Sequence, residues 1–208
     1  CISIFAEAMS DFETKAKYER FAKAYEFYFD KSTRFMRGLD SKGEWRTPFN
    51  PRASTHRSDD YCEGTAWQWT WFVPHDVDGL GNLMGGEDAF VQKLDSLFTA
   101  DSSLEGEMIS SDISGLIGQY AHGNEPSHHV IHLYNYVNRP WRTQELVDSA
   151  YQSQYANSTD GLSGNEDCGQ MSAWYILNSM GCYQVCPGKP IYSIGRPAFD
   201  KAVINLPE

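Results

Sequence analysis

Apolar and polar positions along this chain define two kinds of helical segment that alternate. Residues 11–30, 87–98 and 140–155 each have one apolar stripe, and in 87–98 it falls at positions 90, 91, 94, 97 and 98. This spacing predicts one-sided amphipathic helices. Residues 61–72, 126–138 and 168–180 are apolar on most faces, which predicts buried helices.

The segments between these helices contain the turn formers. Residues 34–60 are predicted to be a long ordered loop, 79–86 a glycine-rich turn and 99–119 a loop. Short apolar runs at 191–194 and 202–204 predict short strands. For residues 61–72 a strand with one aromatic face remains an alternative to the helix.

Alternation of amphipathic and buried helices is typical of an inner and an outer helical layer. We therefore predict an all-α fold, a partial (α/α)6 toroid comprising about half of the barrel, with a few short β-strands at the C-terminal end. Residues 1–180 would form the helical part, and residues 181–208 would begin a C-terminal β-strand segment. The chain begins without an initiator Met and in a helix-like run, so we expect it to be a fragment of a longer protein.

Composition narrows the possible partners. The 208 residues carry a net charge of −11, which argues against nucleic acid and anionic membranes as partners, and aromatic residues make up 14% of the chain. No apolar run reaches the ~18 residues that cross a bilayer. Five cysteines cannot all pair internally, and a Cys182–Cys186 disulfide remains an open alternative.

Three acidic residues each precede an apolar helix in a loop rich in Gly, Asn, His or Trp. They are Glu63, Glu125 and Asp167. A carboxylate near a helix N-terminus can simply cap the helix, because free N–H groups and the helix dipole stabilise it there. The similar settings of all three favour a shared site, which requires the three loops to converge.

A pair of carboxyl groups can hydrolyse a glycosidic bond if one donates a proton and the other activates water. Glu63 lies beside Trp67 and Trp69, and aromatic burial would raise its pKa, so we assign it the acid role. Asp167 lies among Asn165, Gly169 and Gln170, a polar setting that favours the charged form and the role of base. Trp67 could stack on a sugar, although core packing is an equally simple role for this side chain.

Oxygen ligands and histidines suggest two different metals. Asn124 and Glu125 offer only oxygen atoms, which suits a hard cation such as calcium. His128 and His132 are four residues apart and would share a helix face, so a zinc site is the alternative. A zinc site would need a third ligand that the sequence does not identify.

Three motifs resemble those of glycoside hydrolase family 92, a family of calcium-dependent inverting exo-α-mannosidases. The motifs are EGTAWQWTWFVPHD (63–76), HGNEPSHH (122–129) and GNEDCGQMSAWY (164–175). The resemblance implies that Glu63 is the general acid and Asp167 the general base, and that Asn124 and Glu125 lie near calcium. It also implies that Trp67, His122, Glu125 and Asn165 contact the substrate, a mannose-containing oligosaccharide or N-glycan with α-1,2 as the expected linkage.

The resemblance further implies partners within one parent protein: an N-terminal β-sandwich and the remaining half of the barrel. A secreted, periplasmic or cell-surface location is expected on the same ground. Asn165 stands where many members carry a second Asp, and an amide cannot share a proton with Asp167. We expect the 208-residue chain alone to be inactive, because part of the substrate site would be missing.

A non-catalytic helical module that binds carbohydrate is the alternative function. In that case the aromatic residues would form the binding surface and the acids would only cap helices. A prenyl-binding α/α-toroid enzyme is a weaker alternative, because Asp59-Asp60 lies in a predicted loop and not on a helix.

Overall fold

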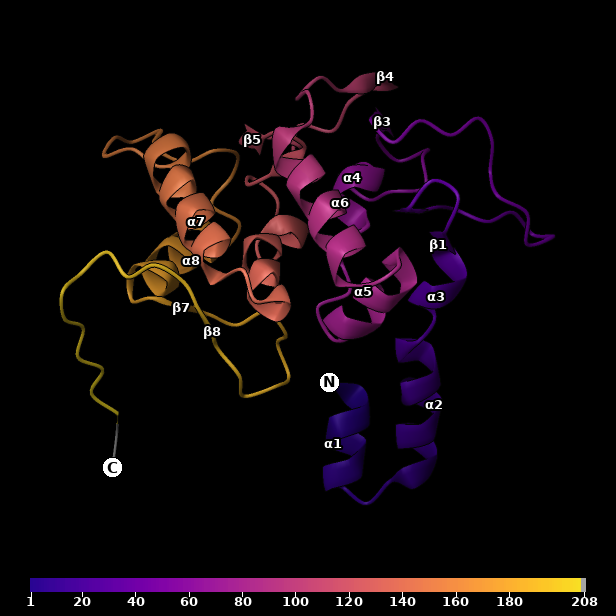
Figure 1. Ribbon diagram of the computed structural model, residues 1–208, viewed down its shortest axis with the longest axis horizontal. Helices are drawn as coiled ribbons and strands as arrows, with labels where there is room; N and C mark the ends of the chain where they lie inside the picture. The colour runs from indigo at the N-terminus through magenta and orange to yellow at the C-terminus, as the bar shows by residue number, and fades with distance from the viewer. Residues whose placement is uncertain (207–208) are drawn as a thin grey trace.

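The computed structural model describes residues 1–206 and shows a mainly helical chain with short strands (Figure 1). The helices are α1 (Ile2–Ala8), α2 (Phe12–Ala22), α3 (Tyr25–Tyr28), α4 (Ala66–Trp69), α5 (Val77–Met84), α6 (Glu87–Thr99), α7 (Pro140–Gln154) and α8 (Gln170–Ser179), with 3-10 helices η1 (Glu125–Ser127) and η2 (Val130–Val137).

The described strands form four separate two-stranded ladders. The antiparallel pairs are β1 (Phe29–Asp30) with β2 (Phe35–Met36), β5 (Leu116–Ile117) with β6 (Tyr120–Ala121), and β7 (Cys182–Tyr183) with β8 (Ser193–Ile194). A parallel pair joins β3 (Ala53–Thr55) to β4 (Glu105–Met108) across 50 residues of sequence. Residues 34–60 are otherwise irregular, as predicted for a long loop.

The core lies where α5, α6, η2 and α7 meet. The apolar stripe of α6 is buried through Phe90, Leu94 and Leu97, and that of α7 through Val147 and Ala150. These helices begin and end close to the predicted boundaries, because their stripes repeat at helical spacing and face one common core. The two predictions are confirmed.

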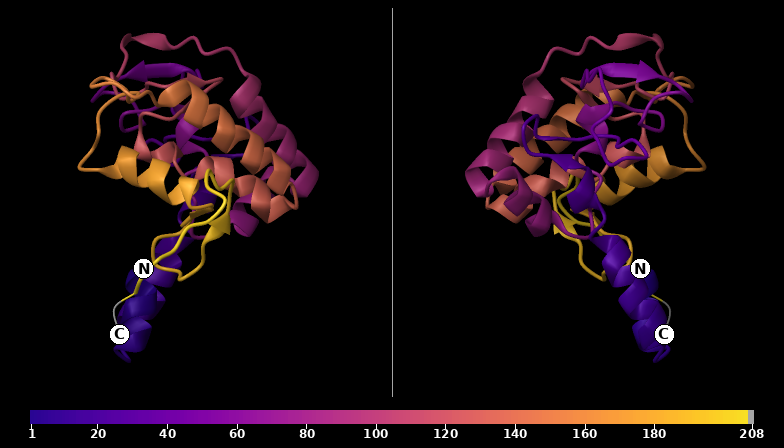
Figure 2. Two further views of the ribbon diagram at one scale, coloured as in Figure 1. Left: turned by 90° about the vertical axis from the view of Figure 1, so that its left-hand side faces the viewer. Right: turned by 90° about the vertical axis from the view of Figure 1, so that its right-hand side faces the viewer.

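The N-terminal helices form a hairpin that extends away from this core (Figure 2). Residues 11–30 do not form one helix: α2 ends at Ala22, and α3 is a separate four-residue turn. No residue of α2 is buried, and Phe12 and Phe21 are exposed. The part of the predicted stripe that lies on α2 is therefore exposed, whereas Phe29, at its end, is buried in the core.

The prediction of a glycine-rich turn at 79–86 was wrong, because Val77–Met84 is helix α5. Asp76 begins it by accepting a hydrogen bond from Gly79 N at 3.1 Å. Gly79 permits a close approach, since a Cβ there would lie 2.2 Å from the Tyr25 hydroxyl. The glycines of α5 allow tight packing, although glycine has a lower helix propensity than other residues. Gly85, with a left-handed backbone (φ +105°), ends the helix.

Two predicted helices are shorter or tighter than expected. Within 61–72 only Ala66–Trp69 is α-helical, and within 126–138 the chain forms 3-10 turns up to a left-handed Asn138. Apolar composition correctly indicated burial of Trp71, Ile131 and Leu133, but it does not distinguish an α-helix from a 3-10 helix.

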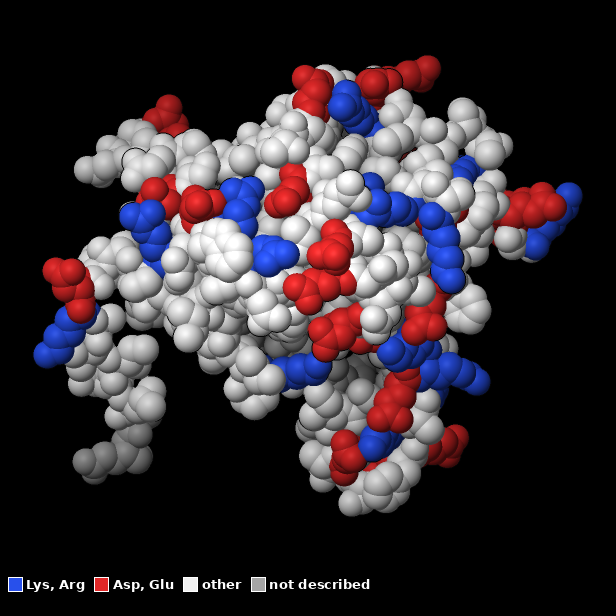
Figure 3. All heavy atoms as spheres, in the orientation of Figure 1, with Lys and Arg blue, Asp and Glu red and all other residues white. Residues whose placement is uncertain are grey.

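The surface and termini complete the fold. On the face shown in Figure 3, Lys and Arg side chains are interspersed with Asp and Glu. Among residues 1–206 no helix has both the length and the apolarity needed to cross a bilayer.

All five thiols are free, including Cys182 and Cys186. Ser193–Ile194 is a strand as predicted, whereas 202–204 is not; residues 207–208 of the expected strand segment lie outside the described residues.

Candidate active site

Glu63 lies in the turn before α4 with a left-handed backbone. Its φ is +51°, a region that residues other than glycine seldom occupy. Trp69 Nε1 donates to Cys62 O at 2.7 Å and holds this turn. The Glu63 side chain is exposed, so the predicted aromatic burial by Trp67 and Trp69 does not occur in this chain.

Asn124 and Glu125 lie at the start of η1. The Asn124 amide is almost buried, 6% exposed, and its Nδ2 donates to Glu63 O at 2.8 Å. This hydrogen bond fixes the Glu63 turn against the loop that carries Glu125. The Glu125 side chain is exposed beside it.

Asp167 lies in a second left-handed turn, immediately before α8. Asp167 and Cys168 have φ values of +51° and +55°, so two consecutive non-glycine residues adopt this rare conformation. Gly164 precedes the turn with φ +75°, and a Cβ there would lie 3.1 Å from Gly123 O. The loop therefore packs directly on the backbone of the loop containing Asn124.

The structure thus brings the three acidic loops together. Asn124 links the turn of Glu63 to η1, and the carboxylate of Glu125 is near enough to Asp167 to raise the pKa of Asp167. Both carboxyl groups line one hollow of about 380 Å³, which we call the acid hollow. Phe72, Gln170 and Tyr183 also line it.

The electrostatic setting of Asp167 differs from the prediction. Partial burial raises its pKa, and the nearby carboxylates of Glu125 and Asp112 raise it further, with His128 acting weakly in the opposite direction. The polar neighbours in sequence suggested a lowered pKa, and that expectation was wrong. Its closest charged neighbours come from loops that are distant in sequence.

Capping does not account for these acids. The N-cap of α4 is Thr65, whose hydroxyl accepts from Trp67 N at 3.2 Å. At α8 it is Glu166 that accepts from Ser172 N, at 3.0 Å, and from the Ser172 hydroxyl. No side-chain cap is present at η1. None of the carboxyl groups of Glu63, Glu125 and Asp167 therefore caps the helix that follows it.

The other predicted substrate contacts divide into buried and exposed residues. Trp67 packs edge-on against Phe35 at 4.9 Å and lies under the ammonium of Lys93. His122 has no exposed surface, so a direct contact between it and a sugar is ruled out in this fold. Asn165 is exposed in the loop of Asp167.

Buried histidines lie close to the acid hollow, and one of them, His129, lines it. Tyr155 donates to Met171 O, so its hydroxyl accepts from His122 Nε2 at 2.8 Å, and His122 Nδ1 accepts from Tyr120 at 2.8 Å. Burial lowers the pKa of His122 to about 3 and that of His128 to about 4. These rings are neutral and support the loops above them.

A histidine zinc site does not form. His128 and His132 direct their Nε2 atoms at His122 O and Asn178 Oδ1, each at 2.9 Å. Within the described residues no three His, Cys, Asp or Glu side chains gather to hold a metal. Hydrogen bonds that fix the rings take the place of metal ligation.

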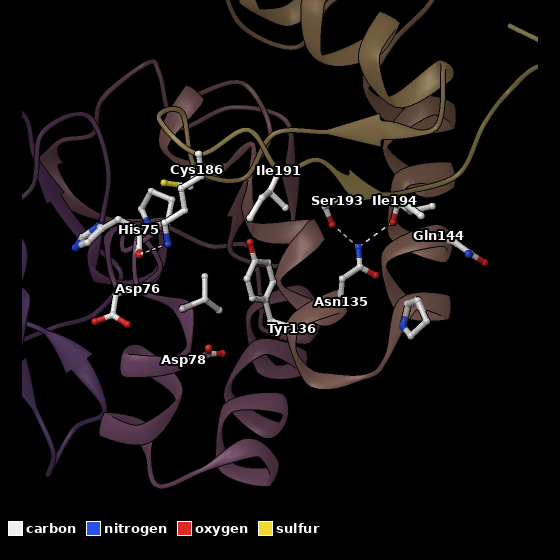
Figure 4. A pocket seen from close by; sticks show the side chains of 14 residues that line it. His75, Asp76, Asp78, Asn135, Tyr136, Gln144, Cys186, Ile191, Ser193 and Ile194 are labelled. Carbon is white, nitrogen blue, oxygen red and sulfur yellow. Dashed lines mark hydrogen bonds between the residues drawn. The ribbon is translucent and has the colours of Figure 1, made fainter. Parts of the chain in front are cut away.

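A larger hollow, of about 590 Å³, lies elsewhere, between α5, η2, α7 and the β8 segment (Figure 4). Its polar wall includes Asn135, whose amide donates to Ser193 Oγ and Ile194 O. None of the three acids lines it. Volume therefore does not single out the candidate site, and the convergence of the acidic loops is the reason for choosing it.

Sequence reasoning missed three residues near the acids. Asp112 lies within electrostatic reach of Asp167, and Gln170 and Tyr183 line the acid hollow. Asp112 sits in a Ser- and Gly-rich loop, a signal similar to those of the three predicted acids. Tyr183 carries no local signal, because β7 brings it in from beyond α8.

Comparison with known proteins identifies two similar solved structures. A family 92 α-mannosidase from Bacteroides thetaiotaomicron, solved in complex with mannoimidazole, is 43% identical with a TM-score of 0.87, over 95% of this chain and 26% of that one. A family 92 inverting mannosidase from the same organism is 37% identical with a TM-score of 0.78, over 96% and 28%.

A protein described as an uncharacterized secreted glycosidase from Arthroderma benhamiae is 33% identical over 153 residues, which is 74% of this chain and 18% of that protein. The chain thus spans little more than a quarter of the solved relatives and less than a fifth of the fungal one. The profile of the glycosyl hydrolase family 92 catalytic domain matches residues 1–208, and the chain belongs to this family of glycosidases.

Proposed function

We propose that a protein of the relatives' full length carrying this chain hydrolyses terminal α-linked mannose from glycans with inversion of configuration. The main support is the meeting of three acidic loops whose carboxyl groups cap no helix. The solved relatives are α-mannosidases, and one of them is described as inverting. An α-1,2 linkage and an N-glycan or related oligosaccharide are the proposed substrate features.

In the proposed mechanism Glu63 donates a proton to the leaving oxygen, and Asp167 removes a proton from the attacking water. A raised pKa makes the ionised form of Asp167 a stronger base. Its neighbours Glu125 and Asp112 therefore contribute to the strength of the base. Asn165, exposed in the same loop, is placed to orient water or a sugar hydroxyl.

Calcium is the proposed cofactor, with Asn124 and Glu125 among its ligands. The donor set fits a hard cation: an amide oxygen remains after Asn124 Nδ2 is bonded to Glu63 O, and a carboxylate is next to it. Two neighbouring carboxyl groups, Glu125 and Asp167, would also be stabilised by a nearby positive charge. When bound, calcium would polarise mannose hydroxyls and favour a flattened ring.

The remaining proposals concern the parent protein. The helices would form about half of an (α/α)6 toroid, followed from residue 181 by a C-terminal strand segment. An N-terminal β-sandwich and the other barrel half would complete the substrate site, so the isolated chain should be inactive. A secreted, periplasmic or cell-surface location is proposed, and the fungal relative described as secreted supports it.

The test is product analysis by NMR on the full-length protein with linkage-defined mannobioses. Release of β-mannose from the α-1,2 substrate is expected, with activity lost on chelation and restored by calcium. Asp167→Asn should lower kcat by ~10³-fold or more, whereas the exposed Asp160→Asn is the matched control and should be unaffected.

Retained glycan binding without turnover in the unmodified protein would favour the non-catalytic module. Release of α-mannose would instead refute inversion and leave a retaining glycosidase. Turnover by the 208-residue chain alone would contradict the proposal that the missing segments complete the site.

A further inference from the structure

Gln170 is the first residue of α8, and its amide is fixed in one orientation by a buried partner. The side-chain nitrogen lies 3.0 Å from His128 Nδ1 and 3.3 Å from the Tyr183 hydroxyl, to which it donates. Gln170 N also donates to Asp167 O at 3.1 Å, so this residue is tied to the turn of the proposed base.

The tautomer of His128 decides which way the amide faces. His128 Nε2 lies 2.9 Å from His122 O, and a carbonyl can only accept, so the ring proton is on Nε2. The ring is 1% exposed, and burial keeps it neutral by lowering its pKa to about 4. Nδ1 therefore accepts, and the Gln170 NH₂ group must face it.

This leaves Gln170 Oε1 without a partner among residues 1–206, in a side chain that lines the acid hollow. Tyr183 lines the same hollow, and its pKa is raised to about 12 by burial, so the phenol keeps its proton at neutral pH. The Tyr183 oxygen accepts from Gln170, which leaves its O–H free to donate. One acceptor and one donor thus stand side by side next to Asp167.

A sugar hydroxyl both donates and accepts, so this pair matches its hydrogen-bonding needs. We propose that Gln170 and Tyr183 together bind one hydroxyl of the mannose residue whose glycosidic bond is cleaved. This inference rests on the proposed function and adds two binding residues to it. The buried His128 acts as a positioning residue, because it orients the amide without touching the sugar.

The test uses the full-length protein and compares kcat/KM for an aryl α-mannoside with its 2-, 3-, 4- and 6-deoxy analogues. In the unmodified protein one of these deoxy substrates should lose about 10-fold. In Gln170→Met the same deletion should cost less than in the unmodified protein, because only the hydrogen bond to Tyr183 remains to be lost. Tyr183→Phe, which keeps the ring, should show a similar reduction of the penalty at the same position.

Gln152→Met, on the exposed face of α7, is the matched control and should leave every deoxy penalty unchanged. Deoxy penalties in Gln170→Met and Tyr183→Phe that equal those of the unmodified protein at every position would overturn the inference while leaving mannoside hydrolysis intact. Failure of the unmodified protein to hydrolyse any α-mannoside would instead overturn the proposed function, and this inference with it.

Discussion

Two sets of titratable side chains meet in this molecule, and they differ in how their polar atoms are used. The histidines beneath the acid hollow are buried, and each directs Nε2 at a fixed partner, such as Trp71 O for His129 and Asn178 Oδ1 for His132. Of the three acids, Glu63 and Asp167 lie in left-handed turns, and none of the three carboxyl groups caps the helix that follows it.

The buried histidines have a structural role, whereas the acids are the candidates for catalysis. A buried, neutral histidine whose Nε2 is hydrogen-bonded inside the protein is not placed to exchange a proton with a substrate. The carboxyl group of Asp167, held in a left-handed turn with two other acids nearby, remains available. Histidines and acids are both common catalytic residues, so the residue type does not distinguish the two sets. Their burial and hydrogen bonds do.

Glu63→Gln is expected to have the largest effect, and it tests whether the exposed acids are the catalytic groups. If Glu63 donates the proton, kcat/KM for an aryl α-mannoside with a poor leaving group should fall by ~10³-fold, because general acid catalysis contributes up to about 10⁴. A substrate whose leaving group needs no proton should lose far less. Initial rates for a series of leaving groups on the full-length protein measure this.

The exposed Glu107→Gln on β4 controls for loss of one carboxylate and should behave like the unmodified protein. An equal loss with good and poor leaving groups would remove Glu63 from the role of acid, and the contrast between exposed acids and buried histidines would then need another explanation.

The second effect is the pH dependence of the free energy of unfolding that the buried histidines cause. Burial lowers the pKa of His129 and His132 to about 4, below the ordinary value near 6.5. The unfolded chain then binds more protons, so these rings stabilise the fold fully above about pH 6.5, and that stability is lost as pH falls toward 4. Between pH 7 and pH 5 each should cost about 2 kcal/mol of unfolding free energy.

Urea unfolding of the full-length protein at pH 7, 6 and 5 measures this slope. His132→Gln should reduce the slope by the share of one histidine, whereas replacement of the exposed His75 should not change it. Unfolding free energy that is constant over this range would show that the histidines titrate normally, and the distinction between the two sets would fail.

Parts of this arrangement could be predicted from sequence because the information is local. The stripes of α6 and α7 repeat at helical spacing, and Glu63, Glu125 and Asp167 stand in loops rich in turn formers. Resemblance to family 92 supplied the family, which composition alone could not. Periodicity failed where tertiary contacts decide, as at α5, whose glycines allow the approach of Tyr25.

The site was less predictable than the helices, for a physical reason. The pKa of Asp167 depends on Glu125 and Asp112, which are 42 and 55 residues away in sequence. Sequence neighbours suggested the opposite direction. The role of His122 depends on its complete burial, and the orientation of Gln170 depends on the tautomer of His128. A sequence motif predicts neither the burial nor the tautomer.

The smallest expected effect concerns the free energy of unfolding at the turn of Glu63, and it tests whether Thr65 or Glu63 caps α4. Thr65 is fully buried, and its hydroxyl caps α4, so Thr65→Ala should lower the unfolding free energy by about 1 kcal/mol, whereas Thr65→Ser keeps the oxygen and should lose less. Because the cap, and not Glu63, satisfies the helix, Glu63→Gln should leave stability unchanged in the same urea experiment. A larger loss from Glu63→Gln than from Thr65→Ala would mean that the acid supports the helix after all, and that its carboxyl group is less free than the capping geometry indicates.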